Sequence, residues 1–256
     1  MLDQNFETLR LLFTRSNSLP HLRASALKLV DRIDSGASSA AELEKVIAAD
    51  PALTAKLLKA ATSVVAARDA GSVTTIRSAI LHLGHDAVRS ISLSLAVQSL
   101  VTDAKGEDTF DARRFARHSL FVGVFASFLF RHRAQRPTES TWSPEEVFAG
   151  GVLHDLSEAL LFRVAPDVYV RTATYARHQQ IPYAQAFQRL YEHPLCELGT
   201  LTVEAWRLPT LFREVILHAD RPWLNEREYS ALCCVHFADA IAERAGFPSG
   251  PEPLPV

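Results

Sequence analysis

Several residue types are scarce in this 256-residue sequence, and each shortage excludes a class of protein. The three cysteines, Cys196, Cys233 and Cys234, are odd in number and have neither the spacing of a disulfide framework nor that of a zinc motif. A reducing, cytoplasmic environment is therefore expected. Long hydrophobic runs are also missing, because the longest, residues 119–130, is too short to span a bilayer and reads as a buried helix. No signal peptide is expected, since no basic segment precedes an apolar run at the N-terminus.

An excess of charge of one sign is missing as well. The chain has 27 basic and 29 acidic residues, which gives a formal net charge of −2. Such a balanced chain has no overall field that would attract a phosphate backbone or an anionic membrane. We therefore expect neither direct nucleic-acid binding nor membrane association.

Strand signals are scarce, whereas signals that start helices recur along the chain. Two serines stand three residues before a glutamate, in the spacing of a capping box: Ser39 before Glu42, and Ser143 before Glu146. Prolines also stand where helices are expected to begin, at positions 51, 144, 166, 182, 194 and 209. With 48% hydrophobic residues, the chain can bury a large core. These patterns predict an all-α fold.

A polar, glycine-containing stretch over residues 101–110 separates two apolar helical regions. We expect it to divide two helical lobes, one formed by residues 1–102 and the other by residues 108–245. Residues 246–256 are so rich in proline and glycine that a disordered tail is expected.

The segment 149–161, AGGVLHDLSEALL, is predicted to be an apolar helix with His154 and Asp155 side by side in its middle. His118 and Asp239 also lie in apolar helical stretches, where an unpaired imidazole or carboxylate would be costly to bury. Two explanations stand. The histidines could be core residues that bond to backbone carbonyls, which from composition and spacing alone is the more common case. Alternatively, the four side chains converge on a metal ion.

Imidazole nitrogens and carboxylate oxygens together suit Fe, Mn, Zn or similar divalent ions. Ligands from separate helices can enclose such an ion at the centre of a bundle. Adjacent residues on one helix, about 100° apart, could both reach it. A metal held in this way could lower the pKa of a bound water and direct it at phosphorus.

Six segments follow one another in the order and spacing of HDOD domains, the HD-related output domains of bacterial signalling proteins. They are LPHLRASALKLVDRI, AADPALTAKLLKAATS, VTTIRSAILHLGHDAVRSISLSLAV, FARHSLFVGVFASFL, VFAGGVLHDLSEALL and EAWRLPTLFREVILH. The resemblance covers approximately residues 16–220. It implies a two-lobed helical fold whose C-terminal lobe is similar to the HD phosphohydrolases and the HD-GYP cyclic-dinucleotide phosphodiesterases.

In the HD superfamily, the metal ligands follow the order His, His-Asp, Asp. Carried over to this sequence, the resemblance implies the ligands His118, His154, Asp155 and Asp239. The last of these lies beyond the segments that carry the resemblance. The implied cofactor is one divalent metal: Fe, Mn, Zn or Mg.

The sequence departs from active HD-GYP relatives just after the His-Asp pair. Those relatives usually continue as HDIGK, with the lysine near the scissile phosphate, whereas this chain reads HDLSE. Ser157 therefore replaces glycine, and Glu158 replaces the lysine. A carboxylate there would repel the charge that develops on a phosphate, so the resemblance implies a poor hydrolase.

The residues that would hold a second metal are incomplete too. The family often reads HAEVG where this chain has LCELG, so that Leu195 takes the place of a histidine and His193 lies two residues earlier. The later histidine cluster is reduced to His218. A two-metal clamp for in-line displacement would therefore be missing. His193, His218 and Glu158 remain as accessory candidates.

Two functions from different classes follow. The first is a catalytically inactive regulatory module of bacterial signal transduction, which binds a partner protein or a small, nucleotide-like ligand and retains one structural metal. The alternative is a metal-dependent phosphohydrolase that acts on a nucleotide or cyclic dinucleotide through His118, His154, Asp155 and Asp239. The sequence names neither the partner nor the oligomeric state.

Overall fold

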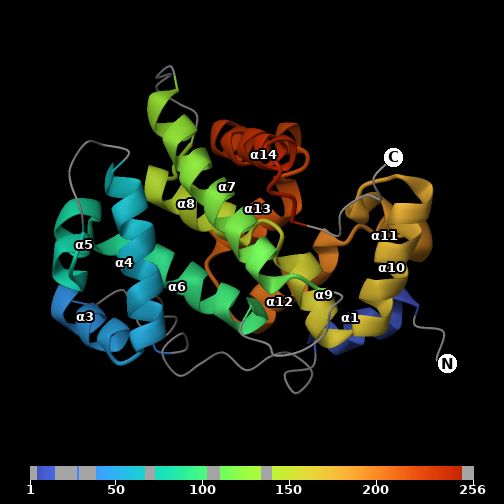
Figure 1. Cartoon of the computed structure of the whole chain (residues 1–256), viewed down its shortest axis with the longest axis horizontal. Coiled ribbons are helices and arrows are strands. Elements are labelled where there is room, and N and C mark those ends of the chain that lie inside the picture. Colours follow the sequence, from blue (N-terminus) through green and yellow to red (C-terminus); the bar gives the residue numbers. More distant parts are fainter. Residues whose placement is uncertain are drawn as a thin grey trace.

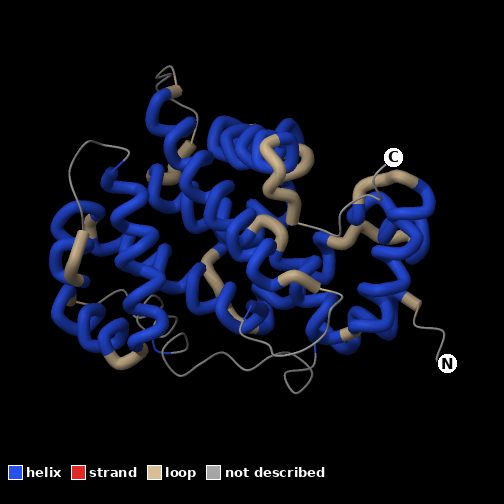
Figure 2. The backbone as a smooth tube through the Cα atoms, in the orientation of Figure 1, coloured by secondary structure: helices blue, strands red, loops and turns tan. Residues whose placement is uncertain are grey.

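The computed structural model describes residues 5–14, 28, 39–66, 73–102, 110–133 and 140–249. Within these ranges, all regular structure is helical and no strand is present (Figure 2). The prediction of an all-α fold is therefore confirmed.

A group of four helices forms one end of the molecule (Figure 1). They are α3 (Ala40–Ala48), α4 (Pro51–Ala66), α5 (Ile76–Leu83) and α6 (His85–Thr102). The long helix α6 is the innermost of the four, because it packs along α8 of the second group as well as on α4 and α5. It thereby joins the two groups.

The second group contains the remaining helices of residues 112–244. They are α7 (Ala112–His132), α8 (Pro144–Leu153), α9 (Leu156–Val164), α10 (Pro166–Gln179), α11 (Tyr183–Tyr191), α12 (Cys196–Ala205), α13 (Thr210–His218), the short 3₁₀ helix η1 (Pro222–Leu224) and α14 (Tyr229–Arg244). The first helix of the chain, α1 (Phe6–Thr14), also belongs here in space, because it packs against α12 (Figure 1). In this group, α7 is central and has α8 and α14 on its sides.

The two capping boxes that the sequence predicts are present at the starts of their helices. Ser39 and Glu42 form a complete capping box at α3, and Ser143 and Glu146 form another at α8. In each box the serine side chain accepts a hydrogen bond from the glutamate backbone N–H, and the glutamate side chain accepts one from the serine backbone N–H. These bonds satisfy N–H groups that the first turn of a helix leaves without partners.

Buried apolar side chains from both groups of helices form one continuous core. The proposed boundary between the lobes falls on residues 101–110, of which 103–109 lie outside the described residues, so the domain limits stay a prediction. Of the segment expected to be a disordered tail, residues 246–249 are described, and Phe247 packs against the core. Residues 250–256 are not among the residues that the structure describes.

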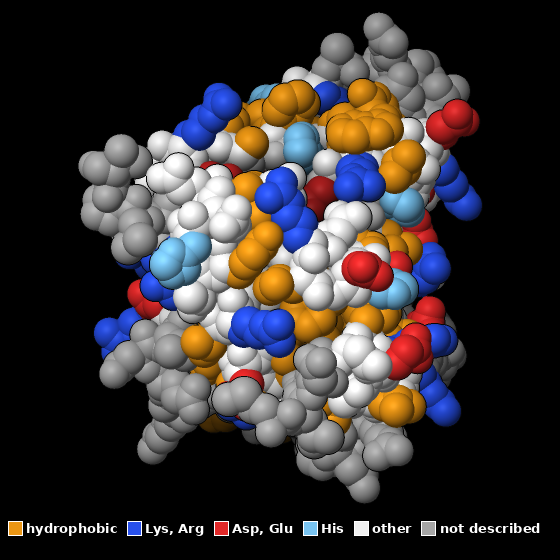
Figure 3. Space-filling model, turned by 90° about the vertical axis from the view of Figure 1, so that its right-hand side faces the viewer, with side chains coloured by type: hydrophobic (Ala, Val, Ile, Leu, Met, Phe, Trp, Pro, Cys, Tyr) orange, Lys and Arg blue, Asp and Glu red, His pale blue; other side chains and the backbone are white. Residues whose placement is uncertain are grey.

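The surface around α10 and α11 carries basic, acidic and apolar side chains in alternation (Figure 3). Neither sign of charge gathers into one patch on this face. In the described part of the chain, the helices are too short or too polar to cross a lipid bilayer.

Candidate metal centre

The helix predicted over residues 149–161 is interrupted at the His-Asp pair. Helix α8 ends at Leu153 and α9 begins at Leu156, which places His154 and Asp155 in the turn between them. The backbone departs from helical geometry at Asp155, where φ is −96° and ψ is 19°. The expectation of a pair in the middle of one helix was therefore wrong. Because of this turn, and not because of a 100° step along one helix, the side chains of His154 and Asp155 point in the same direction.

Two glycines determine how closely α7 approaches α8. A Cβ atom on Gly151 would lie 2.8 Å from Gly123 Cα, and one on Gly123 would lie 2.8 Å from the carbonyl oxygen of Phe148. Neither backbone could give way to such an atom, because both belong to packed helices. This close contact brings His118, on α7, beside His154 at the end of α8.

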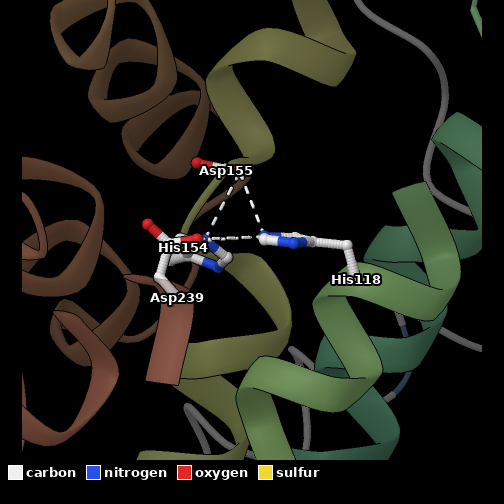
Figure 4. A group of neighbouring side chains, drawn as sticks. All are labelled: His118, His154, Asp155 and Asp239. Atoms are coloured by element: carbon white, nitrogen blue, oxygen red, sulfur yellow. Dashed lines mark hydrogen bonds and ion pairs between the residues drawn. The ribbon is translucent and has the colours of Figure 1, made fainter. Parts of the chain in front are cut away.

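The four side chains predicted from the sequence come together (Figure 4). His118 Nε2 lies 3.3 Å from His154 Nε2, 3.5 Å from Asp155 Oδ2 and 3.3 Å from Asp239 Oδ1. His154 Nε2 lies 3.3 Å from Asp155 Oδ2 and 3.5 Å from Asp239 Oδ1. Helix α7, the α8–α9 turn and α14 thus each contribute to one cluster, which we call the HHDD cluster.

The other ring nitrogen of each histidine has a backbone partner. His118 Nδ1–H donates to the carbonyl oxygen of Phe247 at 2.6 Å, and His154 Nδ1–H donates to that of Gly151 at 2.8 Å. Histidines that bind metals almost always hold their second nitrogen in this way, because the bond selects the tautomer and orients the ring. Both Nε2 atoms are therefore left to face the centre of the HHDD cluster. The bonds to backbone carbonyls that the first explanation predicts are therefore present, and they leave the Nε2 atoms available for the metal ion that the second explanation requires.

The spacing of the four atoms fits a metal ion. All four lie within 4.8 Å of one another. Around a tetrahedral ion with ligands at 2.0–2.2 Å, neighbouring ligand atoms are separated by about 3.4 Å, and the five separations given above are between 3.3 and 3.5 Å. A pair of imidazoles with a pair of carboxylates suits Zn, Fe or Mn better than the all-oxygen preference of Mg.

The charges in the HHDD cluster compensate one another. Burial lowers the pKa of His118, but its contacts with Asp155 and Asp239 outweigh this effect and raise the pKa to about 10. The same opposition raises the pKa of His154 to about 9. Burial favours the protonated form of Asp239, but its close contacts with His118 and His154 hold its pKa below the ordinary value. The two carboxylates thus require positive charge between them, which a divalent ion also supplies.

The histidine rings are more deeply buried than the carboxylates. The His118 side chain is fully buried, whereas the side chains of Asp155 and Asp239 are 29% and 24% exposed. A pocket adjoins the cluster where Asp155 faces outward, between α9 and the start of α12. Its cavity volume is about 60 Å³, far below the 300–1,000 Å³ or so that is typical of sites for drug-sized molecules.

The polar lining of the pocket consists mainly of carboxyl groups and includes neither lysine nor arginine. Its lining comprises His154, Asp155, Ser157, Glu158, Ala184, Leu195, Cys196, Ile216, Ala219 and Asp220. Glu158 is only 6% exposed, and burial, reinforced by the charge of Asp155, raises its pKa to about 8. The pKa of Asp220 is raised for the same two reasons. The hydroxyl of Tyr169 donates to Glu158 Oε1 at 3.4 Å.

The two accessory histidines lie outside the HHDD cluster. The ring of His193 stacks on Phe6 with a centroid separation of 3.9 Å, and its Nδ1 is 3.3 Å from Glu197 Oε2. His218 Nε2 is 3.6 Å from Glu214 Oε2. Of the three accessory candidates, only Glu158 lines the pocket.

Two partners at the site were not singled out in the sequence. The carbonyl of Phe247 supports His118, and the hydroxyl of Tyr169 contacts Glu158. A backbone carbonyl leaves no trace in residue identity, and Phe247 lies in a segment whose proline and glycine content predicted a tail. Tyr169 lies eleven residues from Glu158, on a different helix, so only the folded chain brings the two together.

Solved structures with the same fold include three bacterial proteins, all of low sequence identity. An HDOD domain protein with unknown function from Geobacter sulfurreducens has a TM-score of 0.72 at 22% identity, over 98% of this chain and 84% of that one. A protein from Shewanella amazonensis, provisionally named a phosphohydrolase, has a TM-score of 0.69 at 22% identity, over 92% and 81%. One from Marinobacter aquaeolei, provisionally named a signal transduction protein, has a TM-score of 0.62 at 17% identity, over 100% and 54%.

Sequence comparison extends the likeness from the fold to a family. A search of curated proteins finds no match. The family model of the HDOD domain, however, matches residues 19–222, which include His118, His154 and Asp155 but not Asp239. Because this match covers most of the sequence, the chain belongs to the HDOD domain family.

Proposed function

We propose that this protein is a regulatory HDOD module of bacterial signal transduction that acts in the cytoplasm by binding a partner protein or a small, nucleotide-like ligand. In this proposal, the HHDD cluster holds one divalent metal ion with a structural role, and the protein does not hydrolyse phosphoesters. The ion would tie α7, the α8–α9 turn and α14 together.

One observation carries the proposal: Glu158 is buried in the pocket beside the HHDD cluster. By resemblance to HD-GYP enzymes, this position would hold a lysine near the scissile phosphate. Glu158 and Asp220 instead give the pocket two further carboxyl groups next to Asp155. With its pKa raised to about 8, Glu158 is largely protonated near neutral pH and cannot supply the positive charge that a lysine would, so the pocket lacks a major source of rate enhancement in such reactions.

The size of the pocket supports the same conclusion. A cavity of about 60 Å³ is too small to enclose a nucleotide beside the HHDD cluster. A nucleotide would have to bind outside it. A small-ligand role therefore needs a surface beyond this pocket, and a protein partner is the simpler occupant.

The alternative function is a metal-dependent phosphohydrolase. It is favoured by the convergence of two imidazoles and two carboxylates, with the carboxylates turned toward solvent. A bound ion would act there as a Lewis acid and activate a water molecule. His118 and His154 would hold the ion through their Nε2 atoms. Asp155, which also lines the pocket, would lie nearest to an entering substrate.

Metal content and turnover, measured on the same preparation, test the two functions. The purified protein is analysed for Zn, Fe and Mn before and after reconstitution. It is then assayed with phosphomonoesters, nucleoside triphosphates and cyclic dinucleotides in the presence of Mn or Fe. We expect one ion per chain and no turnover.

Three outcomes are informative. Turnover that is lost in both His154→Ala and Asp239→Ala would overturn the regulatory proposal and establish the hydrolase. Protein that takes up no ion in stoichiometric amount would remove both the hydrolase and the structural metal. An ion without turnover supports the regulatory module, and a pull-down with the ion-loaded protein then becomes the route to its partner.

A further inference from the structure

The chain beyond α14 turns back toward α7. The turn has the hydrogen bonds of a helix C-terminus, because the Gly246 N–H donates to the carbonyl of Glu243 at 3.2 Å and the Phe247 N–H donates to that of Ala242 at 2.8 Å. Gly246 has a φ of +82°, in the left-handed region that glycine adopts without strain. The helix thus ends in a defined turn, and the residue after the glycine has a set position.

The side chain of Phe247 is held by two residues of α7. Its ring stacks on Phe121 with a centroid separation of 5.3 Å, and the guanidinium of Arg117 lies 5.2 Å above its centroid. Pro248 follows directly, and a residue that precedes proline is restricted to extended conformations. Together, these contacts fix the direction in which the Phe247 carbonyl points.

That carbonyl accepts the 2.6 Å hydrogen bond from His118 Nδ1–H. We propose that Phe247 is a positioning residue of the HHDD cluster. By holding His118, the segment 246–249 completes a metal centre that also includes His154, Asp155 and Asp239. The inference rests on the metal site proposed above. It adds the turn after α14 to that site, and this turn, like Asp239, lies beyond residue 222, where the match to the HDOD family model ends.

The contact has a thermodynamic consequence. If docking of the segment 246–249 raises the affinity of the cluster for an ion, then the ion must stabilise the docked segment by the same factor. Metal binding and the C-terminal turn are therefore coupled, and anything that displaces Phe247 from α7 weakens the metal site.

Two truncations test the inference. A chain that ends at Ala245 lacks the Phe247 carbonyl, whereas a chain that ends at Ser249 retains it and serves as the matched control. Loss of a group that holds a ligating histidine typically costs 10- to 100-fold in metal affinity. Competition with a chelator should show a loss of about that size for the shorter chain only, with circular dichroism confirming that both chains are helical.

A pair of point variants covers the case in which the shorter chain does not fold. Phe247→Ala keeps the carbonyl but loses the ring that anchors it. Phe128→Ala, which removes an exposed phenylalanine of α7, serves as the control. We expect a smaller loss of affinity than on truncation for Phe247→Ala and none for Phe128→Ala. Equal affinities in these two variants would overturn the inference, as would wild-type affinity in a folded chain that ends at Ala245.

Two further measurements separate this inference from the proposed function. The Nδ1–H of His118 should give a slowly exchanging resonance in protein with ¹⁵N-labelled histidine, and this resonance should broaden or vanish in Phe247→Ala but not in Phe128→Ala. If the protein takes up no ion, the metal site fails, and this resonance decides the positioning role alone. If it does take up an ion, hydrogen exchange at the Phe247 amide should slow on loading, and an unchanged rate would refute the coupling.

Discussion

The two sides of Asp155 differ in how their charges are balanced. Toward the protein interior, the HHDD cluster places two carboxylates against two imidazoles whose pKa values are raised to about 10 and about 9. Toward the pocket, Glu158 and Asp220 have raised pKa values because they are buried beside the charge of Asp155. The first arrangement could hold a cation in a fixed geometry, whereas the second offers neither lysine nor arginine to an anionic substrate.

This difference separates two features of the site: a cluster of side chains that could hold a metal ion, and a pocket without lysine or arginine in its lining. The metal-binding geometry depends on helix packing, on the α8–α9 turn and on backbone carbonyls. Phosphate binding depends on the charge of a few side chains at the pocket. A chain can therefore lose the second while it keeps the first, and such a chain would remain a stable scaffold for binding other molecules.

The largest expected effect comes from removing a histidine of the HHDD cluster, in which the charges compensate one another. In His154→Ala, one of the two imidazoles is lost, and metal affinity should fall by more than about 100-fold, beyond the loss for a supporting residue. Elemental analysis after dialysis measures it. His178→Ala, which changes a histidine on the exposed face of α10, is the control and should retain the ion. Equal metal content in the two variants would contradict the assignment of His154.

The next effect concerns the contact that places the two imidazoles together. Gly151→Ala puts a methyl group against the backbone of Gly123, so that α7 and α8 must separate. Overpacking of this kind costs about 1–3 kcal/mol of unfolding free energy, and we expect weaker metal binding as well. In Gly150→Ala, the nearest neighbours of the new methyl are side-chain atoms of Val215 and Leu211 rather than backbone atoms, and side chains give way more easily than packed backbone. Denaturant unfolding should therefore show a smaller loss for Gly150→Ala, and the reverse order would contradict this account.

The carboxyl group of Glu158 in the pocket should affect how the stability of the protein depends on pH. The pKa of Glu158 is raised to about 8 from an ordinary value of 4.5 by burial and by Asp155, against the smaller opposing effects of His118, Tyr169 and Arg114. A raised carboxyl pKa gives stability that is complete below the unfolded pKa and is lost as the pH rises through the folded one. Glu158→Gln cannot ionise and should avoid that loss.

For metal-free protein, we therefore expect Glu158→Gln to gain on the wild type between pH 5 and pH 9, by on the order of 2 kcal/mol. Thermal unfolding at the two pH values measures the gain. Glu192→Gln, at an exposed position after α11, serves as the control and should show a flat difference. A flat difference for Glu158→Gln would mean that its carboxyl is solvated in the folded protein.

The smallest effects are expected at the accessory histidines. His193→Ala and His218→Ala remove side chains that pair with Glu197 and Glu214 outside the HHDD cluster. Partly exposed ion pairs of this kind contribute about 0–1 kcal/mol. Metal content should stay at the wild-type value in both variants. A loss of bound ion in either one would place a further ligand at the centre.

The sequence predicts best those features that depend on neighbouring residues. The capping boxes at Ser39 and Ser143 are each complete within four residues, and both form as expected. The four side chains of the HHDD cluster could be named because resemblance to a family supplied their order, although Asp239 lies outside the matched region. The break between α8 and α9 could not be predicted, because every residue of AGGVLHDLSEALL tolerates a helix.

Composition and local patterning were enough to establish a helical chain with its principal start sites, since caps and apolar spacing act within one or two turns. Which polar groups meet in the interior was settled by packing between distant segments. The contact of Gly123 with Gly151 sets the spacing of two imidazoles, the α8–α9 turn aims the His-Asp pair, and a carbonyl 129 residues away from His118 holds its ring. Such contacts involve backbone atoms that every residue shares, and for that reason only the folded chain reveals them.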